Sequence, residues 1–276
     1  MVTEKQIFKE GYAILRAAKI EYSEFDAKQL FENAFCHKIT SPLFEKQEAD
    51  AAKSEKFLSD CKRRANREPL QYILGNWEFY SLPFYVNENV LIPRADTEIA
   101  VEAALKYVND GDTVYDFCCG SGCIGITVAK YKKCNMTLFD ISEQALSVAR
   151  KNTVLNGVFA SVERLDVLND IAKKKADVII SNPPYLDKSE MESLQPELRH
   201  EPSLSLFGGD DGLDFYRALA VKQKQSLKLN GLFILEIGEN QAKSVTDIFT
   251  DNGYERLELI NDYSGNNRVL IFRNIF

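Results

Sequence analysis

The sequence predicts an α/β fold, in which a seven-stranded, doubly wound sheet follows a small helical domain and a β-hairpin linker. Three observations support this prediction. From about residue 94 onward, strand-like segments alternate with helix-like segments, which is typical of a mostly parallel sheet. The first 70 residues instead carry apolar side chains at helical spacing. Between these two regions lies a short stretch rich in aromatic and β-branched residues.

Residues 1–70 are expected to form the helical domain, because apolar side chains recur there every three or four positions. The segments with this spacing are 4–18, 25–36 and 50–64. Residues 71–92 differ, since aromatic and β-branched side chains are interrupted by Gly75, Pro83 and an Asn-Glu-Asn turn. This composition is typical of a β-hairpin, which we expect to link the two domains.

Residues 93–276 are expected to form the doubly wound domain. The segment 176–181 is apolar from Val178 to Ile180, as a strand buried on both faces should be. The last two strands have no helix between them and should form an antiparallel pair. The expected strands are 113–117, 135–140, 161–165, 176–181, 232–236, 254–260 and 268–273. The expected helices run from the first strand's glycine turn to residue 131 and over 142–156, 214–229 and 241–252.

Composition excludes several classes of protein. The chain has 276 residues, of which 45% are hydrophobic and 27% charged, as in ordinary globular proteins. The net charge of −7 argues against a protein that coats duplex nucleic acid. Residues 1–70 are nearly neutral, so the acidity comes from the rest of the chain. No apolar run is long enough to span a membrane, and the N-terminus does not resemble a signal peptide. We therefore expect a cytoplasmic protein, and a monomer.

The six cysteines do not suggest a metal site or disulfides. Four of them lie between residues 118 and 134, but they do not form two spaced Cys-x-x-Cys pairs, and the chain has only two histidines. We expect reduced thiols that fill the core or turns, because a chain of this length does not need disulfides. A redox role for the cluster stays open. The clustered cysteines are Cys118, Cys119, Cys123 and Cys134.

A glycine turn follows the first expected strand of the sheet. Gly120, Gly122 and Gly125 match the Rossmann-like dinucleotide fingerprint, and Asp140 lies 20 residues beyond Gly120. In a doubly wound sheet an acid at the end of the second strand reaches a ribose hydroxyl. The alternative, a turn that serves only tight packing, is disfavoured because strand, turn, helix and spaced acid occur together. The sequence therefore predicts a nucleoside cofactor.

Acidic residues around this turn favour S-adenosylmethionine over NAD. Asp116 stands at the strand end beside the turn, where its negative charge would oppose a pyrophosphate and suit a cationic sulfonium. Asp166, after the third strand, is a further candidate for cofactor binding, and Val167 beside it could form an apolar wall for the adenine. Position alone leaves open whether Asp166 binds the cofactor or only caps a turn.

The sharpest motif is Asn182-Pro183-Pro184-Tyr185, directly after the buried fourth strand. Two consecutive prolines cannot continue a strand ladder or enter the interior of a helix. They stiffen the chain at the carboxyl end of a strand, where open α/β sheets bind ligands. A rigid exit from the strand is the simpler alternative, but the glycine turn and the ribose acid favour a functional role.

The residue types of this motif suit methyl transfer to a planar NH₂ group. Such a nitrogen has a delocalised lone pair and must be oriented before it attacks a methyl group. The Asn182 oxygen can accept one N–H, and the Pro183 carbonyl, constrained by the proline after it, can accept the other. Tyr185 can pack over the planar group. Orientation and electrostatics then suffice without a covalent intermediate. Adenine N6, cytosine N4 and a carboxamide all remain possible targets.

Other stretches resemble the family of peptide chain release factor glutamine methyltransferases (PrmC/HemK). Residues 67–75 are similar to that family's linker signature, and 90–98 to its Ile-Pro-Arg-Pro-Glu-Thr-Glu segment. Residues 201–213 are similar to its loop after Asn-Pro-Pro-Tyr, and two later stretches to its C-terminal pattern. The resemblance runs from about residue 65 to the end; residues 1–64 match only as a helical region of suitable length.

The resemblance implies a class I methyltransferase domain that moves a methyl group from S-adenosylmethionine to a glutamine side-chain amide. The glutamine lies in the Gly-Gly-Gln loop of class 1 release factors, the protein partners implied, and the helical domain would dock them. For the cofactor it implies a loop of Cys118, Cys119, Gly120, Ser121 and Gly122, with Asp140 on the ribose, Val167 at the adenine and Asn182 nearby. For the substrate it implies Asn182, Pro183, Pro184 and Tyr185, with Pro93 and Arg94.

The sequence departs from the family's pattern at two places. Cys118 and Cys119 stand where the family usually has glycine and threonine, so the backbone angle at Cys118 could differ. Ala95 and Asp96 replace the usual proline and glutamate. Because Gly120, Gly122, Arg94 and Glu98 are retained, we expect cofactor binding and the substrate contact to survive.

Two other substrates stay open. A related family methylates a glutamine of a ribosomal protein and shares the motif, although the linker and the segment Pro93–Glu98 favour release factors. A nucleic-acid amino methyltransferase would need a basic groove. The candidate phosphate site for that reading is Lys62, Arg63, Arg64 and Arg67, which could equally be a solvated helix face.

Overall fold

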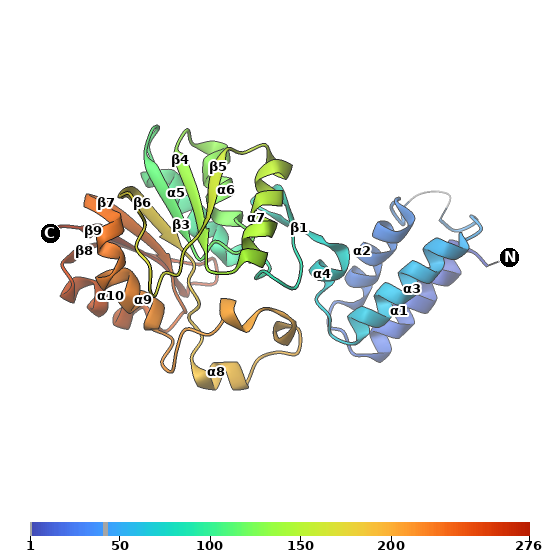
Figure 1. The fold of residues 1–276 in the computed structure, drawn as a ribbon. Coiled ribbons are helices and arrows are strands. Elements are labelled where there is room, and N and C mark those ends of the chain that lie inside the picture. Colours follow the sequence, from blue (N-terminus) through green and yellow to red (C-terminus); the bar gives the residue numbers. More distant parts are fainter. Residues whose placement is uncertain (1, 41–43) are drawn as a thin grey trace. The chain divides into compact units, whose positions relative to one another are not determined.

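The computed structural model of the protein describes residues 2–40 and 44–276, and Figure 1 shows its fold. The chain divides into two compact units. The first runs up to Gly75 and includes Gln195–His200, whereas the second comprises Asn76–Leu194 and Glu201–Phe276. The first unit thus ends five residues later than the predicted helical domain and takes in a short segment from the distant loop after Asn-Pro-Pro-Tyr.

The first unit is helical. Thr3 caps the first helix through a reciprocal pair of hydrogen bonds with Gln6, and Asp50 caps the third through the Lys53 N–H. A short fourth helix ends at Gly75, which adopts a left-handed φ of +73°. The helices are α1 (Glu4–Ala17), α2 (Ser23–Phe35), α3 (Ala51–Ala65) and α4 (Leu70–Leu74).

An aromatic core holds these helices together. Phe31 and Phe57 are fully buried, and their ring centroids lie 5.5 Å apart in an edge-to-face arrangement. Helix α1 approaches α3 closely at Gly11, where an added Cβ would lie 2.4 Å from the Phe57 ring. Glycine is therefore the residue that lets these two helices pack.

The predicted hairpin is present, but it starts later than expected. Strands β1 (Asn76–Phe79) and β2 (Leu82–Tyr85) pair antiparallel, whereas Leu70–Leu74, which the prediction divided, form α4. The side chains of Leu70, Tyr72 and Ile73 are buried, so their burial favours a helical turn over an extended strand.

The described residues of the second unit form a seven-stranded sheet with the order β5-β4-β3-β6-β7-β9-β8 (Figure 1). The five strands β3 to β7 run parallel, and β9 pairs antiparallel with both β7 and β8. This arrangement confirms the predicted fold class and the antiparallel final pair. The strands are β3 (Thr113–Phe117), β4 (Asn135–Asp140), β5 (Ala160–Arg164), β6 (Ala176–Ser181), β7 (Leu227–Glu236), β8 (Tyr254–Asn261) and β9 (Asn267–Asn274).

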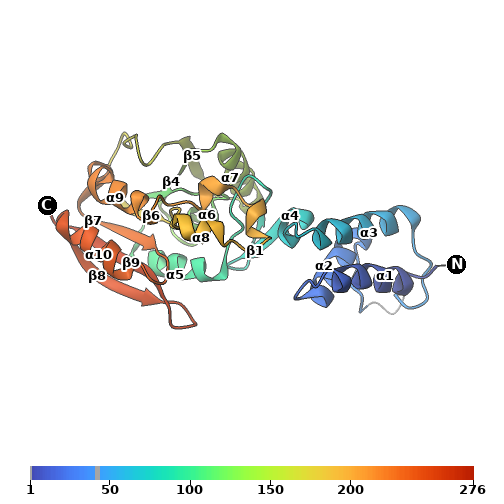
Figure 2. The same cartoon turned by 90° about the horizontal axis from the view of Figure 1, so that it is seen from below.

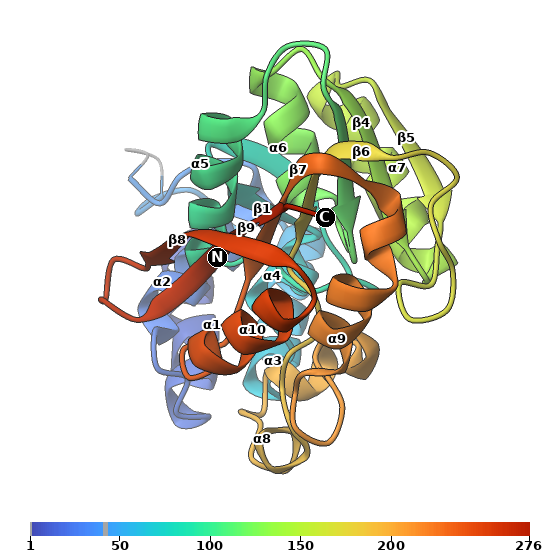
Figure 3. The same cartoon turned by 90° about the vertical axis from the view of Figure 1, so that its left-hand side faces the viewer.

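Helices cover both faces of the sheet (Figure 3). Helices α5, α6 and α7 contribute to one buried apolar cluster, together with Phe79 and Phe84 of the hairpin. Helices α9 and α10 contribute to a second cluster on the other face, and α10 packs along β8 (Figure 2). The helices are α5 (Glu98–Tyr107), α6 (Cys123–Tyr131), α7 (Glu143–Asn156), α9 (Asp214–Val221) and α10 (Ala242–Asp251).

One predicted helix is too long. The sequence predicts helix over 214–229, but α9 ends at Val221 and β7 already begins at Leu227. The side chain of Leu227 is fully buried and its backbone pairs with Ala176 of β6. Sheet pairing therefore outweighs the local helical pattern at this point.

The long connection from β6 to α9 contains the short helix α8 (Lys188–Glu192) and the 3₁₀ turns η2 (Leu198–His200) and η3 (Ser203–Ser205). None of the helices in residues 2–40 and 44–276 has the combination of length and apolarity that crossing a bilayer needs. The same residues contain no group of three or more His, Cys, Asp or Glu side chains placed to hold a metal ion.

Candidate active site

A pocket lies at the carboxyl ends of four neighbouring parallel strands of the second unit. This is the position where open α/β sheets bind ligands. Each strand supplies wall residues from the turn that follows it. These are Cys118 and Gly120 after β3, Asp140, Ile141 and Ser142 at the end of β4, Leu165, Asp166, Val167 and Leu168 after β5, and Asn182 and Pro184 after β6.

The glycine turn after β3 is strained at Cys118. This residue has a φ of +58°, in the left-handed region that favours glycine, although it carries a side chain. The backbone thus adopts a glycine-like conformation at a residue that is not glycine. The N–H of the neighbouring Cys119 donates to the Phe139 carbonyl, which ties the turn to β4 at 2.9 Å. Burial raises the pKa of both thiols well above its ordinary value, so both stay protonated at neutral pH.

Asp116 supports the turn but does not line the pocket. Its carboxylate is fully buried and accepts the Gly125 N–H of helix α6 at 2.9 Å. Its other oxygen has no hydrogen-bond partner among the described residues. Burial raises the pKa of Asp116 to about 7. Direct contact with a cationic cofactor, as the sequence suggested for Asp116, would have to come through this second oxygen.

Asp140 does line the pocket, and the backbone holds its carboxylate in place. One oxygen accepts the Gly120 N–H and the other the Ser142 N–H, both at 2.9 Å. A carboxylate has about four acceptor positions, so each oxygen can still accept a hydroxyl. Burial raises the pKa of Asp140, although the backbone hydrogen bonds from Ser142 and Gly120 oppose the rise.

Asp166 and Val167 follow strand β5, and they line the same pocket as Asp140 at the end of β4. Asp166 accepts the Leu168 N–H at 2.9 Å and the Asn169 side-chain amide at 2.8 Å, so it is a turn residue as well as a wall residue. Val167 is almost fully buried and contributes an apolar surface.

The structure divides the Asn-Pro-Pro-Tyr motif between two environments. Asn182 and Pro184 line the pocket with Asp140, whereas Pro183 and Tyr185 do not. The Asn182 side-chain nitrogen donates to the Thr97 hydroxyl at 3.4 Å. Tyr185 packs against the second apolar cluster, and its carbonyl accepts the Gln241 side-chain amide at 2.9 Å. Burial raises the pKa of the Tyr185 hydroxyl to about 12, so it stays neutral.

Pro93 and Arg94 are not among the residues that line this pocket. Their segment is instead tied to the loop after Asn-Pro-Pro-Tyr by the buried carboxylate of Glu201. Glu201 accepts the Ile92 N–H at 3.0 Å and forms an ion pair with Arg94. This double contact fixes Pro202, which does line the pocket, next to the 90–98 segment.

The sequence alone did not assign several wall residues of the pocket. They come from three segments far from the strand ends of the sheet, and these segments belong to stretches that resemble the family's motifs or adjoin them. That resemblance was the available signal, because none of the three segments directly follows a strand of the sheet. The residues are Asn89, Val90, Leu91, Leu204, Ser205 and Phe215.

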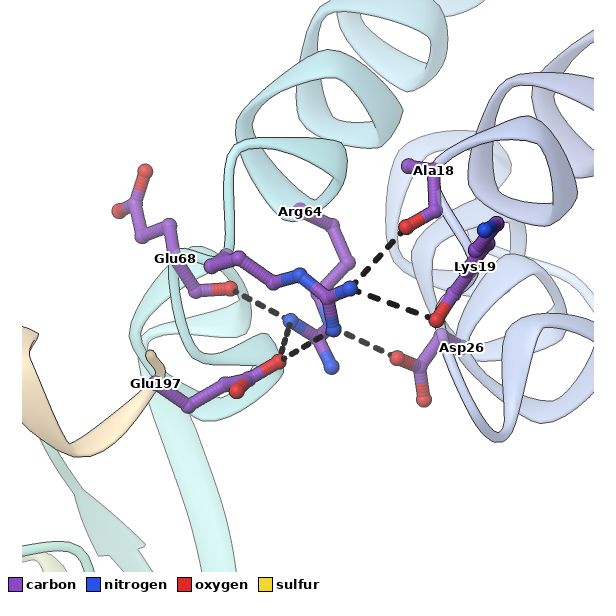
Figure 4. Close-up of polar contacts among 7 residues, drawn as sticks. Ala18, Lys19, Asp26, Arg64, Glu68 and Glu197 are labelled. Carbon is purple, nitrogen blue, oxygen red and sulfur yellow. Dashed lines mark hydrogen bonds and ion pairs between the residues drawn. The ribbon is translucent and has the colours of Figure 1, made fainter. Parts of the chain in front are cut away.

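The basic residues weighed as a phosphate site are largely paired within the first unit (Figure 4). Arg64 donates to Asp26 at 2.7 Å and to Glu197 at 3.0 Å, and Arg67 also reaches Glu197. Arg63 forms ion pairs with Asp60 and Glu68. Burial by itself would raise the pKa of Glu197. Hydrogen bonds, including those from Arg64 and Arg67, outweigh burial and hold the pKa of Glu197 below its ordinary value. The three arginines of the cluster are therefore paired with carboxylates, which does not favour phosphate binding.

Comparison with known proteins gives two kinds of match. Residues 97–199 match the methyltransferase small domain, and residues 6–75 match the PrmC N-terminal domain. A release factor glutamine methyltransferase of Fusobacterium nucleatum subsp. nucleatum is 39% identical, over 91% of this chain and 71% of the relative. The enzyme of the same name from Clostridium acetobutylicum is 33% identical over 97% of each chain.

Solved structures support the fold. A methyltransferase from Pyrococcus furiosus superposes with a TM-score of 0.56 at 16% identity, over 72% of this chain and 91% of that one. A ribosomal protein L11 methylase from Lactobacillus delbrueckii subsp. bulgaricus gives a TM-score of 0.52, also at 16% identity, over 69% of this chain and 84% of its own. At such low identity these likenesses concern the fold alone.

Proposed function

We propose that this chain methylates a release factor, because it belongs to the family of release factor glutamine methyltransferases. The proposed reaction transfers a methyl group to the side-chain amide nitrogen of the glutamine in the Gly-Gly-Gln loop of class 1 release factors. The observation that carries the proposal is the position of Asn182 and Pro184, on the wall of the same pocket as Asp140.

The cofactor of the proposed reaction is S-adenosylmethionine, which supplies an electrophilic methyl group when bound. The pocket suits it chemically. Asp140 keeps free acceptor positions for ribose hydroxyls, and Val167 offers an apolar wall for the adenine. Cys118, Gly120 and Gly122 have positive φ angles, which keeps the backbone of the turn open for close approach. Asp116 is fully buried behind this turn and supports it through the Gly125 N–H. Cys119 and Ser121 hold the turn without lining the pocket.

Asn182 and Pro183 orient the glutamine amide in this proposal. The Asn182 oxygen accepts one N–H of the substrate and the Pro183 carbonyl accepts the other, so the nitrogen faces the methyl group with its lone pair out of plane. Tyr185, neutral at physiological pH, packs against the planar amide. The nitrogen loses its proton after attack, so the chain needs no strong base.

In the same proposal, the helical unit and the hairpin bind the release factor. The methyltransferase domain begins near residue 93. We include Pro93 and Arg94 as substrate contacts through the segment that Glu201 fixes. A monomer suffices for this arrangement. A release factor as substrate implies a cytoplasmic location. Methylation of nucleic acid is disfavoured because the three arginines of the basic cluster are already paired with carboxylates.

The test is radiolabelled methyl transfer to three acceptors side by side: a purified class 1 release factor, its variant with the loop glutamine replaced, and adenine-rich DNA. We expect label on the unaltered release factor only. Asn182→Ala should reduce transfer at least 100-fold with little change in stability, because the substrate amide loses its acceptor. Label on DNA but not on the release factor would overturn the assignment, and wild-type rates for Asn182→Ala would overturn the mechanism.

A further inference from the structure

Glu236, the last residue of β7, is a buried acid that the mechanism above does not use. Its side chain is 2% exposed, and its Oε2 atom has no hydrogen-bond partner among the described residues. Leaving a carboxylate oxygen buried and unpaired is costly, so stability alone does not explain this residue. It therefore needs another account.

The sheet register places Glu236 beside Asn182. Strands β6 and β7 are parallel, and the last printed pair of their register is Ser181 with Leu235. Asn182, directly after β6, and Glu236, the last residue of β7, each follow that pair by one residue. Two residues earlier, Ile180 and Ile234 both face the first apolar cluster, which shows which face of the sheet this position shares. Helix α5 covers that face, and Thr97 lies directly before it.

Thr97 and Asn182 both influence the charge of the Glu236 carboxylate. The Asn182 nitrogen donates to the Thr97 hydroxyl, and hydrogen bonding from the Thr97 and Asn182 side chains favours the charged form of Glu236. A threonine hydroxyl both donates and accepts, so it can accept a hydrogen bond from the Asn182 amide and donate one to the Glu236 carboxylate. Burial nevertheless dominates and raises the pKa of Glu236 to about 7.

Other charges around Glu236 do not neutralise it fully. Arg268 lowers its pKa and Asp96 raises it. The guanidinium of Arg268 is shared, because it donates to Asp262 at 2.9 Å and lies 3.5 Å from Asp96. The carboxylate of Glu236 is therefore kept next to Asn182 at a cost in stability, which is typical of groups retained for function.

An asparagine side chain can present either of two faces. Its oxygen accepts hydrogen bonds and its nitrogen donates them, and the two atoms are nearly equal in size. Only the oxygen can accept the N–H of a substrate amide; the nitrogen turned the same way would repel it. A pair of acceptors behind the side chain, one of them anionic, selects the orientation with nitrogen inward and oxygen outward.

We propose that Glu236 is a positioning residue which, together with Thr97, holds the Asn182 amide by its nitrogen and so presents its oxygen to the substrate glutamine. This inference rests on the proposed function. In this proposal, Glu236 affects the rate of methyl transfer only by orienting the Asn182 side chain.

The experiment measures methyl transfer to a purified class 1 release factor in single-turnover reactions, for wild type, Glu236→Gln, Asn182→Ala and the double variant. A hydrogen bond to a charged group contributes about 1.5–3 kcal/mol, so Glu236→Gln should lower the rate roughly 10- to 100-fold. The KM for release factor and the Kd for S-adenosylmethionine should change less than about threefold. In the Asn182→Ala background, Glu236→Gln should have no further effect.

Stability separates this role from a structural one. Because Glu236→Gln removes a buried charge, its unfolding midpoint at pH 8 should equal or exceed that of wild type while its rate falls. Thr97→Val should slow transfer in the same direction, and Thr97→Ser, which keeps the hydroxyl, should restore most of the rate. Asp177→Asn is the matched control, since Asp177 is a β6 carboxylate at the other end of the strand, bonded to Thr113 and Lys228.

Two results would overturn the inference: wild-type rates for Glu236→Gln, or an equal loss from this substitution with and without Asn182. The wild-type reaction tests the proposed function independently. If wild type itself transfers no methyl group to the release factor, the proposed function fails; if it does and Glu236→Gln matches it, only the positioning role fails.

Discussion

Cys118 occupies a backbone conformation that costs a side-chain-bearing residue about 1–2 kcal/mol. The turn keeps this conformation because the Cys119 N–H and the Gly120 N–H are both bonded to the β4 end, at Phe139 and Asp140. Individual residues of the site are thus held by backbone contacts more than by their own preferences. Asp140 shows the same principle, since two backbone N–H groups fix its carboxylate before any ligand binds.

Replacing Cys118 tests the strain in this turn. At an ordinary position glycine is less stable than alanine, but at a φ of +58° we expect the reverse. Cys118→Gly should be more stable than Cys118→Ala by about 1 kcal/mol, measured by urea unfolding. Comparing the two variants with each other cancels the packing lost with the thiol. A more stable alanine variant would show that the turn relaxes when the side chain shrinks.

Replacing Asp140 tests its role at the cofactor. Asp140→Ala removes the acceptor for the proposed ribose hydroxyls, so we expect the Kd for S-adenosylmethionine, measured by calorimetry, to rise roughly 10- to 100-fold. The rate at saturating cofactor should change much less. As a control, Asp166→Ala should weaken binding less, because Asp166 is already engaged by Leu168 and Asn169. An unchanged Kd for Asp140→Ala would remove this residue from the cofactor site.

Within each unit, elements pack closely at contacts that depend on single residues. Gly11 lets α1 approach Phe57 of α3, and Glu201 ties the 90–98 segment to the loop that follows β6. The segment Gln195–His200 belongs to the first unit because Glu197 joins Arg64 and Arg67 there (Figure 4). Surface ion pairs contribute little, but the Arg64 side chain is only 11% exposed, so screening by water is reduced.

Enlarging Gly11 should destabilise the helical unit. Alanine is the better helix former, by about 1 kcal/mol, yet its Cβ would lie 2.4 Å from the Phe57 ring and 2.9 Å from the Cys61 sulfur. We expect Gly11→Ala to lower the free energy of unfolding by about 1–3 kcal/mol, measured by circular dichroism in denaturant. The exposed neighbour Glu10→Ala is the control and should change stability by less than about 0.5 kcal/mol. A stabilised Gly11→Ala variant would mean that the helices can separate freely.

Across the whole molecule, buried acids of the second unit make stability depend on pH. Burial raises the pKa of Asp116 and of Glu236 to about 7, above the values of 3.8 and 4.5 expected when they are exposed. The folded state therefore binds their protons more tightly than the unfolded state. The stabilisation is complete below the unfolded pKa values and is lost as the pH rises through about 7.

Asp116→Asn isolates one of these contributions. Each unit of pKa shift corresponds to about 1.4 kcal/mol, so the variant should gain a few kcal/mol of stability relative to wild type between pH 5 and pH 8. Chemical denaturation of both proteins at each pH measures this gain, and all other titrating groups cancel in the comparison. A difference in stability that stays constant with pH would show that Asp116 is ionised throughout.

The sequence by itself determined the alternation of strands and helices, the antiparallel final pair and the family. Local patterning carries that information, because apolar periodicity, glycine turns and Asn182-Pro183-Pro184-Tyr185 each lie within a few residues. It also placed Asp140 and Asn182 at strand ends, which any parallel sheet brings to one edge.

Only the tertiary structure decided which distant residues lie near Asp140 and Asn182. Register between β6 and β7 sets Glu236 beside Asn182, and packing of α5 adds Thr97. The pocket walls at Asn89–Leu91 and Leu204–Ser205, and the buried position of Asp116, also depend on contacts between segments far apart in the chain. Such contacts are fixed by the summed packing of the whole domain, so no local pattern in the sequence encodes them.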